Sequence, residues 1–591
     1  MFSLFTESLK LAVKSAPWWA AANVLLSAVR SVAPLALLAL VKMFIDTVSA
    51  SVQTGTAAAG YGLTAIIAAM AAVYLADELS FDAGAWVRKN QSDRLEGFMY
   101  GRLHEKSVSL DLINFERPEY FNILSRASRE APWRPNSILN NIVLLLKGGV
   151  SLLLVAGMVF TVHWLLAAVL LTVNIPGVWL RLKYSAILYG VRREQTQEAR
   201  RSAYFSWLLT GDRPSRELRL FGLGRYFMGL FDRSFAQQKK GEMNIIGRRT
   251  VIEMCSALFK TAAFVFILLF TARQTLAGVL SLGTMAMALL AFRHGMASIK
   301  ELMAAVSGLY EDSLFVADAF EFLHLKDSIC AAEPVAAVKD LENGIRVENM
   351  SFTYPGNAVK TLDGISFELK RGEVAAIVGP NGAGKSALVR LLCRLYDPDS
   401  GRITFDGTDI RHFDPLQYRK QFAVTFQDFM LYNLSLGENI RLGDVADDDG
   451  ERIVRSADRA GLRSLIASLP EGLGTQIGNM FDGSRELSVG EWQKIALARS
   501  LYRQAPVIIL DEPSSALDAE AEFELFSRFR STVNGRTALL VSHRMASVSM
   551  ADRIFVLDRG KITESGSHEE LLNARGLYFD MYMKQAGAAQ A

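Results

Sequence analysis

Cysteine and net charge are what this chain has least of. Its 591 residues include only three cysteines, Cys255, Cys330 and Cys393, which are far apart and have no CxxC companion. This excludes a disulfide framework and a sequence-evident zinc site, so we expect all three to be packing residues. The 64 basic and 61 acidic residues leave a formal charge of only +3, so nothing marks the chain as a nucleic-acid-binding protein.

Apolar sequence is what the chain has in abundance, at 50% hydrophobic against 21% charged residues. This is too apolar for a soluble multidomain enzyme and too long for one ordinary domain. A helix needs roughly 20 apolar residues to cross a hydrocarbon core of about 30 Å, and inside lipid such stretches have to be helices. We predict six spans, at 18–43, 59–81, 140–162, 164–182, 251–272 and 276–299.

Lysine and arginine set the expected orientation of these spans, because cytoplasmic loops retain them. Residues 47–58 carry none, whereas 88–135 and 181–249 are rich in both, with Arg273 a lone exception outside. We therefore expect both termini in the cytoplasm and a multi-pass protein of the plasma (inner) membrane.

A cleaved secretory signal is the alternative interpretation of the N-terminus, since Lys10 and Lys14 precede an apolar run. That run is too long for a signal and contains Arg30, so we favour a retained span. Ionisable residues in or beside spans either line a polar cavity or snorkel and pair between helices. The candidates are Arg30, Asp77, Glu78, Lys260, Arg293 and His294.

The sequence pattern changes near Gly344 from apolar runs to alternating strands. A buried parallel strand at 374–378 runs into a loop that fits G-x-x-x-x-G-K-[ST] at every fixed position. Its glycines let backbone N–H groups surround phosphate oxygens, Lys385 reaches the outer phosphates and Ser386 ligates Mg²⁺. The predicted nucleotide-binding residues here are Gly379, Asn381, Gly382, Gly384, Lys385, Ser386 and Ala387.

A second apolar strand, 507–510, ends in a pair of carboxylates, Asp511 and Glu512. Asp511 is predicted to hold Mg²⁺ and Glu512 to polarise the attacking water in an in-line phosphoryl transfer. A solvated acidic pair is the plain alternative, which the position at the end of a buried strand disfavours. These motifs together predict a P-loop NTPase without saying which kind.

The segment Leu487-Ser488-Val489-Gly490-Glu491, followed by WQKIALAR, narrows this prediction. Here the chain resembles the ATP-binding cassette (ABC) transporter family, and the likeness extends over essentially the whole sequence. The resemblance implies that this signature segment, through Leu487, Ser488, Gly490 and Glu491, binds the γ-phosphate of ATP held by the opposite protomer.

The resemblance also assigns single residues elsewhere in the cassette. Tyr354 matches the aromatic that stacks on adenine, and Gln427 matches the glutamine that touches Mg²⁺ and the attacking water. His543 matches the histidine that contacts the γ-phosphate, and Asp518 lies in the loop that communicates between two sites. Glu512, His543 and Gln427 are therefore the predicted catalytic residues, and Ser386, Gln427 and Asp511 the predicted Mg²⁺ ligands.

The layout resembles that of an exporter half-transporter, a multidomain membrane protein. The prediction is an all-α transmembrane domain of six helices at 1–320, a linker at 321–343, an α/β P-loop NTPase cassette at 344–586 and a tail at 587–591. Two cytoplasmic reversals, near 111–124 and 211–221, gain a role as coupling helices, although from the residues alone both read as solvated loops.

Three positions depart from the family pattern: Val489, Glu491 and Ala387. None of them removes a chemical group needed for hydrolysis, so two copies of one chain would carry two competent sites. A homodimer is therefore predicted, with a heterodimer as the open alternative, and the cofactors are ATP and Mg²⁺.

The transported substrate is the least constrained expectation. The run 481–494 and the segment 217–222 look like those of bacterial exporters of lantibiotic-type and other ribosomally made peptides. With no cysteine-protease domain before the first span, leader cleavage is not expected here. Export of lipids or amphipathic drugs is the runner-up, and a membrane-anchored ATPase that senses rather than transports is the alternative from another class.

Overall fold

The computed structural model of the chain divides into two compact units. One comprises Met1–Val108 with Phe121–Leu325, and the other comprises Ser109–Tyr120 with Lys326–Ala591. The structure describes residues 2–590 except 55–59, 118, 119, 121, 122, 125, 126, 129, 130, 176, 178, 179, 181, 182, 185, 186, 188, 189, 192–195, 213, 327, 328, 515–529, 531, 532 and 534.

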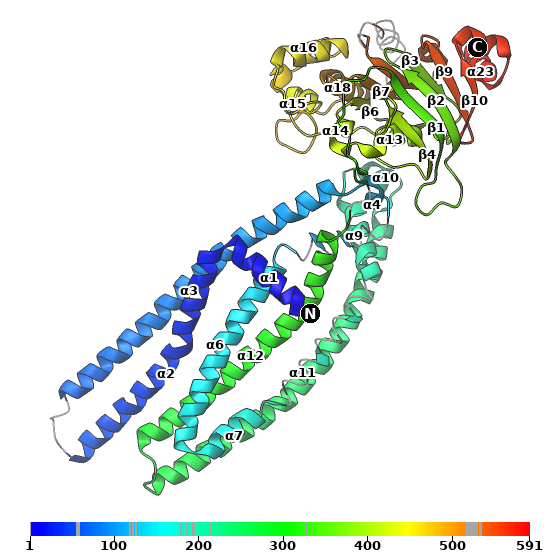
Figure 1. Cartoon of the computed structure of the whole chain (residues 1–591). Coiled ribbons are helices and arrows are strands. Elements are labelled where there is room, and N and C mark those ends of the chain that lie inside the picture. The colour runs from blue at the N-terminus through cyan, green and yellow to red at the C-terminus, as the bar shows by residue number, and fades with distance from the viewer. Residues whose placement is uncertain are drawn as a thin grey trace. The chain divides into compact units, whose positions relative to one another are not determined.

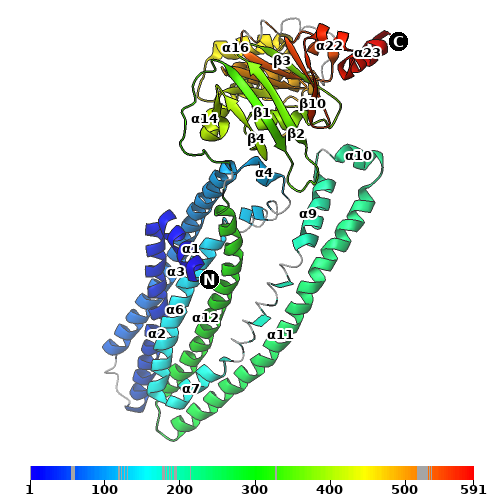
Figure 2. The same ribbon diagram turned by 45° about the vertical axis from the view of Figure 1, so that its right-hand side comes forward.

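The first unit, called the helical unit below, is built from long helices that lie side by side (Figures 1 and 2). Its described helices are α1 (Phe2–Ser15), α2 (Pro17–Thr54), α3 (Gly60–Ser109), α6 (Arg134–Val162), α7 (Trp164–Thr172), α9 (Thr196–Thr210), α10 (Ser215–Leu220), α11 (Gly224–Leu276) and α12 (Leu282–Leu323). The 50 residues of α3 make a rod of about 75 Å, far longer than a hydrocarbon core of about 30 Å.

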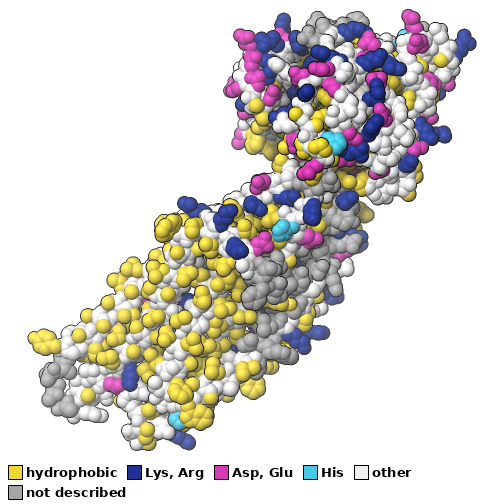
Figure 3. Space-filling model, in the orientation of Figure 1, with side chains coloured by type: hydrophobic (Ala, Val, Ile, Leu, Met, Phe, Trp, Pro, Cys, Tyr) yellow, Lys and Arg dark blue, Asp and Glu magenta, His cyan; other side chains and the backbone are white. Residues whose placement is uncertain are grey.

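Among the described residues, five helices are long and apolar enough to cross a membrane. They are Pro17–Gln53, Tyr61–Ser109, Arg134–Val162, Gly224–Leu276 and Leu282–Ser313. Apolar side chains cover their outer faces, as Figure 3 shows for the helical unit. The chain is therefore a multi-pass membrane protein. The predicted count of six is not reached. The fourth predicted span, 164–182, is represented only by the nine residues of α7, and many residues of 173–182 lie outside the described residues.

The predicted start of the sixth span, residue 276, was wrong. Helix α11 continues to Leu276, and α12 begins only at Leu282. The turn between them includes Gly278 at a φ of 74° and Ser281, whose Oγ accepts a hydrogen bond from the backbone N–H of Thr284 at 3.1 Å. Such a positive φ and such an N-cap end one helix and start the next, which apolarity alone does not reveal.

The second unit, called the cassette below, contains two sheets. The four-stranded sheet has the order β2-β1-β4-β5, and the six-stranded sheet has the order β10-β9-β3-β8-β7-β6. The strands are β1 (Gly344–Phe352), β2 (Leu362–Lys370), β3 (Val374–Val378), β4 (Ser400–Phe405), β5 (Thr408–Asp409), β6 (Phe422–Thr425), β7 (Val507–Asp511), β8 (Thr537–Val541), β9 (Arg553–Asp558) and β10 (Lys561–Gly566).

Helices and apolar clusters cover the six-stranded sheet on both faces, which is why β3, β7 and β8 are buried along their whole length. The helices that matter for the site are α13 (Lys385–Leu392), α16 (Gly450–Arg459) and α18 (Val489–Tyr502). The remaining described helices of this unit are α4 (Leu112–Phe115), α14 (Pro415–Arg419), α15 (Leu436–Arg441), α17 (Arg463–Ser468), α21 (Met545–Val548), α22 (His568–Ala574) and α23 (Leu577–Gln590).

Candidate active site

The predicted catalytic residues follow parallel strands of one sheet. Strands β6, β7, β8, β3 and β9 run in the same direction, so their carboxyl ends meet at one edge. The phosphate-binding loop follows β3, Asp511 ends β7, His543 comes two residues after β8 and Gln427 two residues after β6. Sheet topology therefore gathers residues that lie more than 150 positions apart in the chain.

Residues from these segments line one pocket of about 510 Å³, called the P-loop pocket below, although the predicted residues Gly379 and Asp511 are not among its described lining residues. Its described lining residues are Tyr354, Thr361, Asn381, Gly382, Gly384, Lys385, Ser386, Ala387, Gln427, Glu512 and His543. The structure thus brings together predicted residues from five separate segments. Thr361, in the turn before β2, was not predicted, because no motif marks it.

Two glycines of the loop have backbone conformations that other residues rarely adopt. Gly384 has a φ of 105°, and a Cβ there would lie 2.7 Å from Leu362 Cδ2. Gly379 has a φ of 154°, and a Cβ there would collide with the carbonyl oxygen of Leu557. The loop therefore keeps its shape only with glycine at these positions, and its backbone stays open to a phosphate group.

Lys385 begins helix α13 and turns back over the loop. Its Nζ donates hydrogen bonds to the carbonyl oxygens of Gly379 at 2.8 Å and Pro380 at 3.1 Å. Burial lowers the pKa of this ammonium, while the nearby carboxylates of Glu512 and Asp511 raise it. The cation is held in place by backbone carbonyls that phosphate oxygens can replace.

Asp511 is a buried carboxylate, with only 3% of its surface exposed. Burial raises its pKa to about 6, although a hydrogen bond with Ser386 acts in the opposite direction. Its Oδ1 is buried without a hydrogen-bond partner. A buried carboxylate oxygen without a donor is costly, so this atom is suited to a bound cation.

Glu512 connects two of the other predicted catalytic residues. Its Oε2 accepts a hydrogen bond from Gln427 Nε2 at 2.8 Å, and its Oε1 lies 3.3 Å from His543 Nδ1. Its φ of 51° is left-handed, which costs a non-glycine residue roughly 1–2 kcal/mol. Strain of this kind at a pocket is typical of a functional residue that the surrounding fold holds in position.

Tyr354 lies beside the loop and is linked to the first predicted coupling segment. Its hydroxyl accepts a hydrogen bond from Arg390 Nη1 at 3.1 Å, and the same nitrogen lies 3.5 Å from Glu116 Oε1. Arg390 belongs to α13, and Glu116 follows α4. Burial raises the pKa of the Tyr354 hydroxyl. Sequence motifs did not point to Arg390, since it lies outside every signature.

Segment Ser109–Tyr120 belongs to the same compact unit as the cassette. Leu112 and Ile113 of α4 pack against an apolar cluster of the cassette, and Asp111 Oδ2 accepts a hydrogen bond from the backbone N–H of Ile329 at 2.9 Å. The second reversal includes α10 and lies within the helical unit, so its docking stays a prediction.

The signature segment does not line the P-loop pocket in the described part of one chain. Ser488 is the N-cap of α18, and Glu491 completes a capping box with it: Glu491 Oε2 accepts from the Ser488 backbone N–H at 2.8 Å. The side chain of Val489 is exposed, and Leu487 packs against the cassette core. Asp518 lies outside the described residues.

The model of the ABC transporter family matches residues 362–515 of the chain. The chain is 32% identical to the subtilin transport ATP-binding protein SpaT of Bacillus subtilis over 486 residues. This alignment covers 81% of this chain and 78% of that protein. The chain belongs to the ABC transporter family.

Other relatives of this ABC transporter also match along both units. The nisin transport ATP-binding protein NisT of Lactococcus lactis is 29% identical over 490 residues, covering 82% of this chain and 81% of that protein. An ATP-dependent lipid A-core flippase of Alcanivorax borkumensis is 31% identical over 488 residues, covering 81% of each.

A solved structure shares the fold of this ABC transporter. It is described as a bacterial Atm1-family ABC exporter with ATP bound, and it superposes with a TM-score of 0.81 over 95% of this chain and 97% of that one, at 24% identity. Together with the family match and the relatives along four fifths of the chain, this shared fold confirms the resemblance to an exporter-type half-transporter. The chain is an ATPase that couples ATP hydrolysis to export across a membrane.

Proposed function

We propose that two copies of this ABC transporter form a homodimer in the plasma (inner) membrane, with their cassettes in the cytoplasm. Each of two ATP sites combines the P-loop pocket of one copy with the signature segment of the other. Two observations support this composite site. The described lining of the pocket lacks Ser488 and Gly490, and Ser488 is exposed at the start of α18.

In this proposal ATP binds with its base against Tyr354 and its phosphates over the loop. The backbone N–H groups of the loop and the start of α13 attract phosphate oxygens. Lys385 exchanges its two carbonyl partners for phosphate oxygens, which gains charge-assisted bonds. The partner's Ser488 and Gly490 then approach the γ-phosphate, with the amino end of the partner's α18 adding its dipole.

The donor set fits a magnesium ion, which prefers oxygen ligands. Asp511 supplies a buried carboxylate oxygen that has no hydrogen-bond partner, and Ser386, which is hydrogen-bonded to it, supplies a hydroxyl. The amide oxygen of Gln427 would be the third protein ligand. When bound, the ion neutralises charge on the β- and γ-phosphates.

Glu512 is proposed to accept the proton of the attacking water. Its two contacts, with Gln427 and His543, fix both carboxylate oxygens at the mouth of the pocket. Gln427 orients the water, and His543 donates to the γ-phosphate as charge develops there. Hydrolysis removes the phosphate that both copies share, so the cassettes separate.

The first coupling segment is proposed to transmit the conformational change of the ATP site from the cassette to the helical unit. Glu116 is bonded through Arg390 to the hydroxyl of Tyr354, so occupancy of the base site bears directly on that segment. The helices then alternate between inward-open and outward-open arrangements.

A ribosomally made peptide is the proposed substrate. The observation that carries this is the similarity to two peptide-transport proteins, those for subtilin and nisin, over about four fifths of the chain. A lipid is the second candidate, because a lipid A-core flippase of Alcanivorax borkumensis matches over the same length at 31% identity.

Inside-out proteoliposomes separate the two candidates. We expect ATP-dependent uptake of a labelled lantibiotic-type precursor peptide, and no uptake by the Glu512→Gln variant. Fluorescent lipid A analogues serve as the second arm, with dithionite quenching to measure flipping. Flipping without peptide uptake would replace the first candidate by the second. If neither peptide uptake nor lipid flipping is observed, both candidates are contradicted.

A further inference from the structure

A second pocket of the cassette lies at the opposite edge of the six-stranded sheet. It has a volume of about 550 Å³ and is called the arginine pocket below. Arg371 precedes β3, Pro506 precedes β7 and Arg536 precedes β8, so the pocket is at the amino ends of strands whose carboxyl ends form the P-loop pocket. Its size is within the range of about 300–1,000 Å³ of small-molecule sites.

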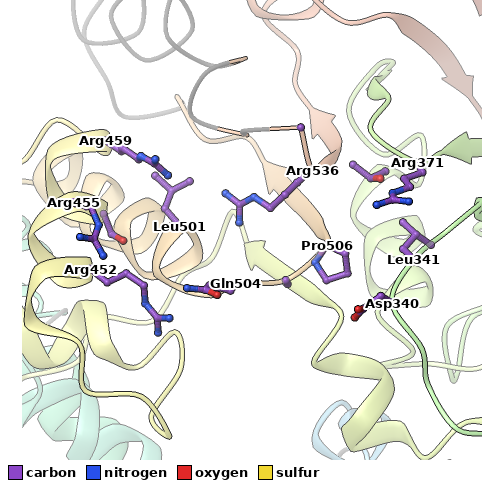
Figure 4. A pocket seen from close by; sticks show the side chains of 14 residues that line it. Asp340, Leu341, Arg371, Arg452, Arg455, Arg459, Leu501, Gln504, Pro506 and Arg536 are labelled. Carbon is purple, nitrogen blue, oxygen red and sulfur yellow. The ribbon is translucent and has the colours of Figure 1, made fainter.

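Five arginines and a single carboxylate, Asp340, are among its described lining residues. Arg452, Arg455 and Arg459 come from one side of α16, because they are spaced three and four residues apart. Figure 4 shows Arg536 projecting from the strand side toward α16, with Arg371 and Asp340 on the far side of it.

Nearby carboxylates account for two of these five charges. Arg452 Nη2 lies 2.5 Å from Asp447 Oδ2, and Arg455 Nη1 lies 3.2 Å from Glu451 Oε2. For Arg371, Arg459 and Arg536, the described part of the cassette contains no carboxylate within 4.0 Å. Three guanidinium groups of the pocket are therefore left without a described counter-ion.

Arg536 is held as a fixed part of the pocket. Its Nε donates to the carbonyl oxygen of Val533 at 3.0 Å and its Nη1 to that of Arg503 at 3.2 Å. Burial lowers the pKa of this guanidinium, and the positive charge of Arg459 lowers it further. The half-buried Arg536 and the exposed Arg459 therefore repel each other at this pocket, an arrangement that a bound anion would relieve.

We propose that the arginine pocket is a second anion site of the cassette, which binds a ligand carrying a di- or triphosphate group. Guanidinium forks match phosphate oxygens in pairs, and three uncompensated cations need more charge than one phosphate group carries. The ligand bridges Arg459 on α16 to Arg371 and Arg536 at the sheet. Because α16 packs on α18, the bound ligand also restrains α18, the helix that begins at the signature segment.

Binding of radiolabelled inorganic triphosphate to the full chain in nanodiscs tests this site. The Lys385→Ala background weakens the P-loop pocket for phosphate, and we expect saturable triphosphate binding to remain. In that background Arg371→Gln with Arg459→Gln should weaken it at least about tenfold, the loss expected for a charge-assisted hydrogen bond.

The matched control changes two other arginines, Arg346→Gln with Arg402→Gln. Both side chains are 57% exposed on the four-stranded sheet, and neither lines the pocket. The control should bind triphosphate within about twofold of the background, since distant surface charges are screened. No saturable binding, or equal losses in both double variants, would overturn the proposal.

Two sources of the phosphate group are distinguished by competition. Tighter binding of ATP than of inorganic triphosphate to the same background supports a nucleotide as the ligand. Equal binding of ATP and inorganic triphosphate supports a free polyphosphate. In either case, ATP should no longer compete with labelled triphosphate when Arg371→Gln and Arg459→Gln are combined. If ATP still competes, the ligand is elsewhere and the assignment fails.

Discussion

Polar groups are used differently in the two units of this ABC transporter. In the cassette, Lys385 and Glu512 line an open pocket, and the neighbouring Asp511 has one buried carboxylate oxygen without a hydrogen-bond partner. In the helical unit, several buried polar side chains bond to one another between helices. Asn23 of α2 donates to Gln91 of α3 at 3.2 Å, for example.

Charges in the helical unit follow the same rule. Arg134 of α6 lies 2.6 Å from Asp312 of α12, and Lys147 lies 3.2 Å from Glu301. His294, a candidate for the cavity, is 3.1 Å from Ser151 Oγ. The two units therefore differ in where polar groups meet: in the cassette they gather around a pocket, whereas in the helical unit they meet between helices and hold them together.

Loss of the proposed general base should break this comparison most strongly. Glu512→Gln keeps the shape of the side chain but removes its basicity, so ATPase activity should fall by about 10²–10⁴-fold while ATP binding persists. Phosphate release and equilibrium binding of labelled ATP measure the two effects. Glu451→Gln, at a side chain that is 89% exposed, is the control. Normal turnover in Glu512→Gln would show that another group is the base.

Breaking the buried ion pair of the helical unit should cost stability and spare the ATP site. Arg134→Met leaves the carboxylate of Asp312, whose side chain is 2% exposed, without its cation. We expect a loss of about 3–5 kcal/mol, seen as a lower thermal midpoint in detergent, with ATP affinity unchanged. Arg134→Met with Asp312→Leu should recover most of the loss. An unchanged midpoint in the single variant would contradict this role.

Arg390→Met sharpens the comparison at the link between the base site and the first coupling segment. It removes the bond to the Tyr354 hydroxyl and the contact with Glu116. We expect the KM for ATP to rise about three- to tenfold, as for one lost hydrogen bond, with transport per ATP hydrolysed also reduced. Arg390→Lys should be intermediate. An unchanged KM for ATP would show that Arg390 does not contribute to binding of the base.

The smallest effect is expected at Glu491. The structure shows its carboxylate in a capping box with Ser488, and glutamine can make the same box. Glu491→Gln should therefore change stability by less than about 1 kcal/mol, through the helix dipole alone, and leave ATPase activity within about twofold. Thermal midpoints and phosphate release measure this. A large loss of activity would mean that the carboxylate itself contacts nucleotide.

The motif segments of the cassette could be located from the sequence because backbone geometry fixes their places. Gly379 and Gly384 are needed for positive φ angles, and Asp511 and Glu512 for their place at the end of a buried strand. Such requirements leave fixed spacings in the sequence. Contacts such as Arg390 with Tyr354 and Glu116 could not be predicted, since they join segments more than 30 residues apart without a motif.

The helical unit could be predicted only in outline. Apolarity located five of the spans, but not the start of α12, which depends on Gly278 and on the Ser281 cap. Nor does the sequence separate polar residues that pair between helices, such as Arg134 and Asp312, from those that would face a substrate. Partner choice there depends on packing, which hydropathy does not encode.

A mixed dimer tests the composite ATP site most directly. One chain carries Lys385→Ala and the other Gly490→Asp, which an N-terminal helical turn tolerates but which repels a γ-phosphate. Purification through two different tags isolates the mixed dimer, in which one composite site is intact and the other has both defects. We predict ATPase activity well above that of either single-variant dimer. Activity no higher than theirs would contradict sites shared between two copies.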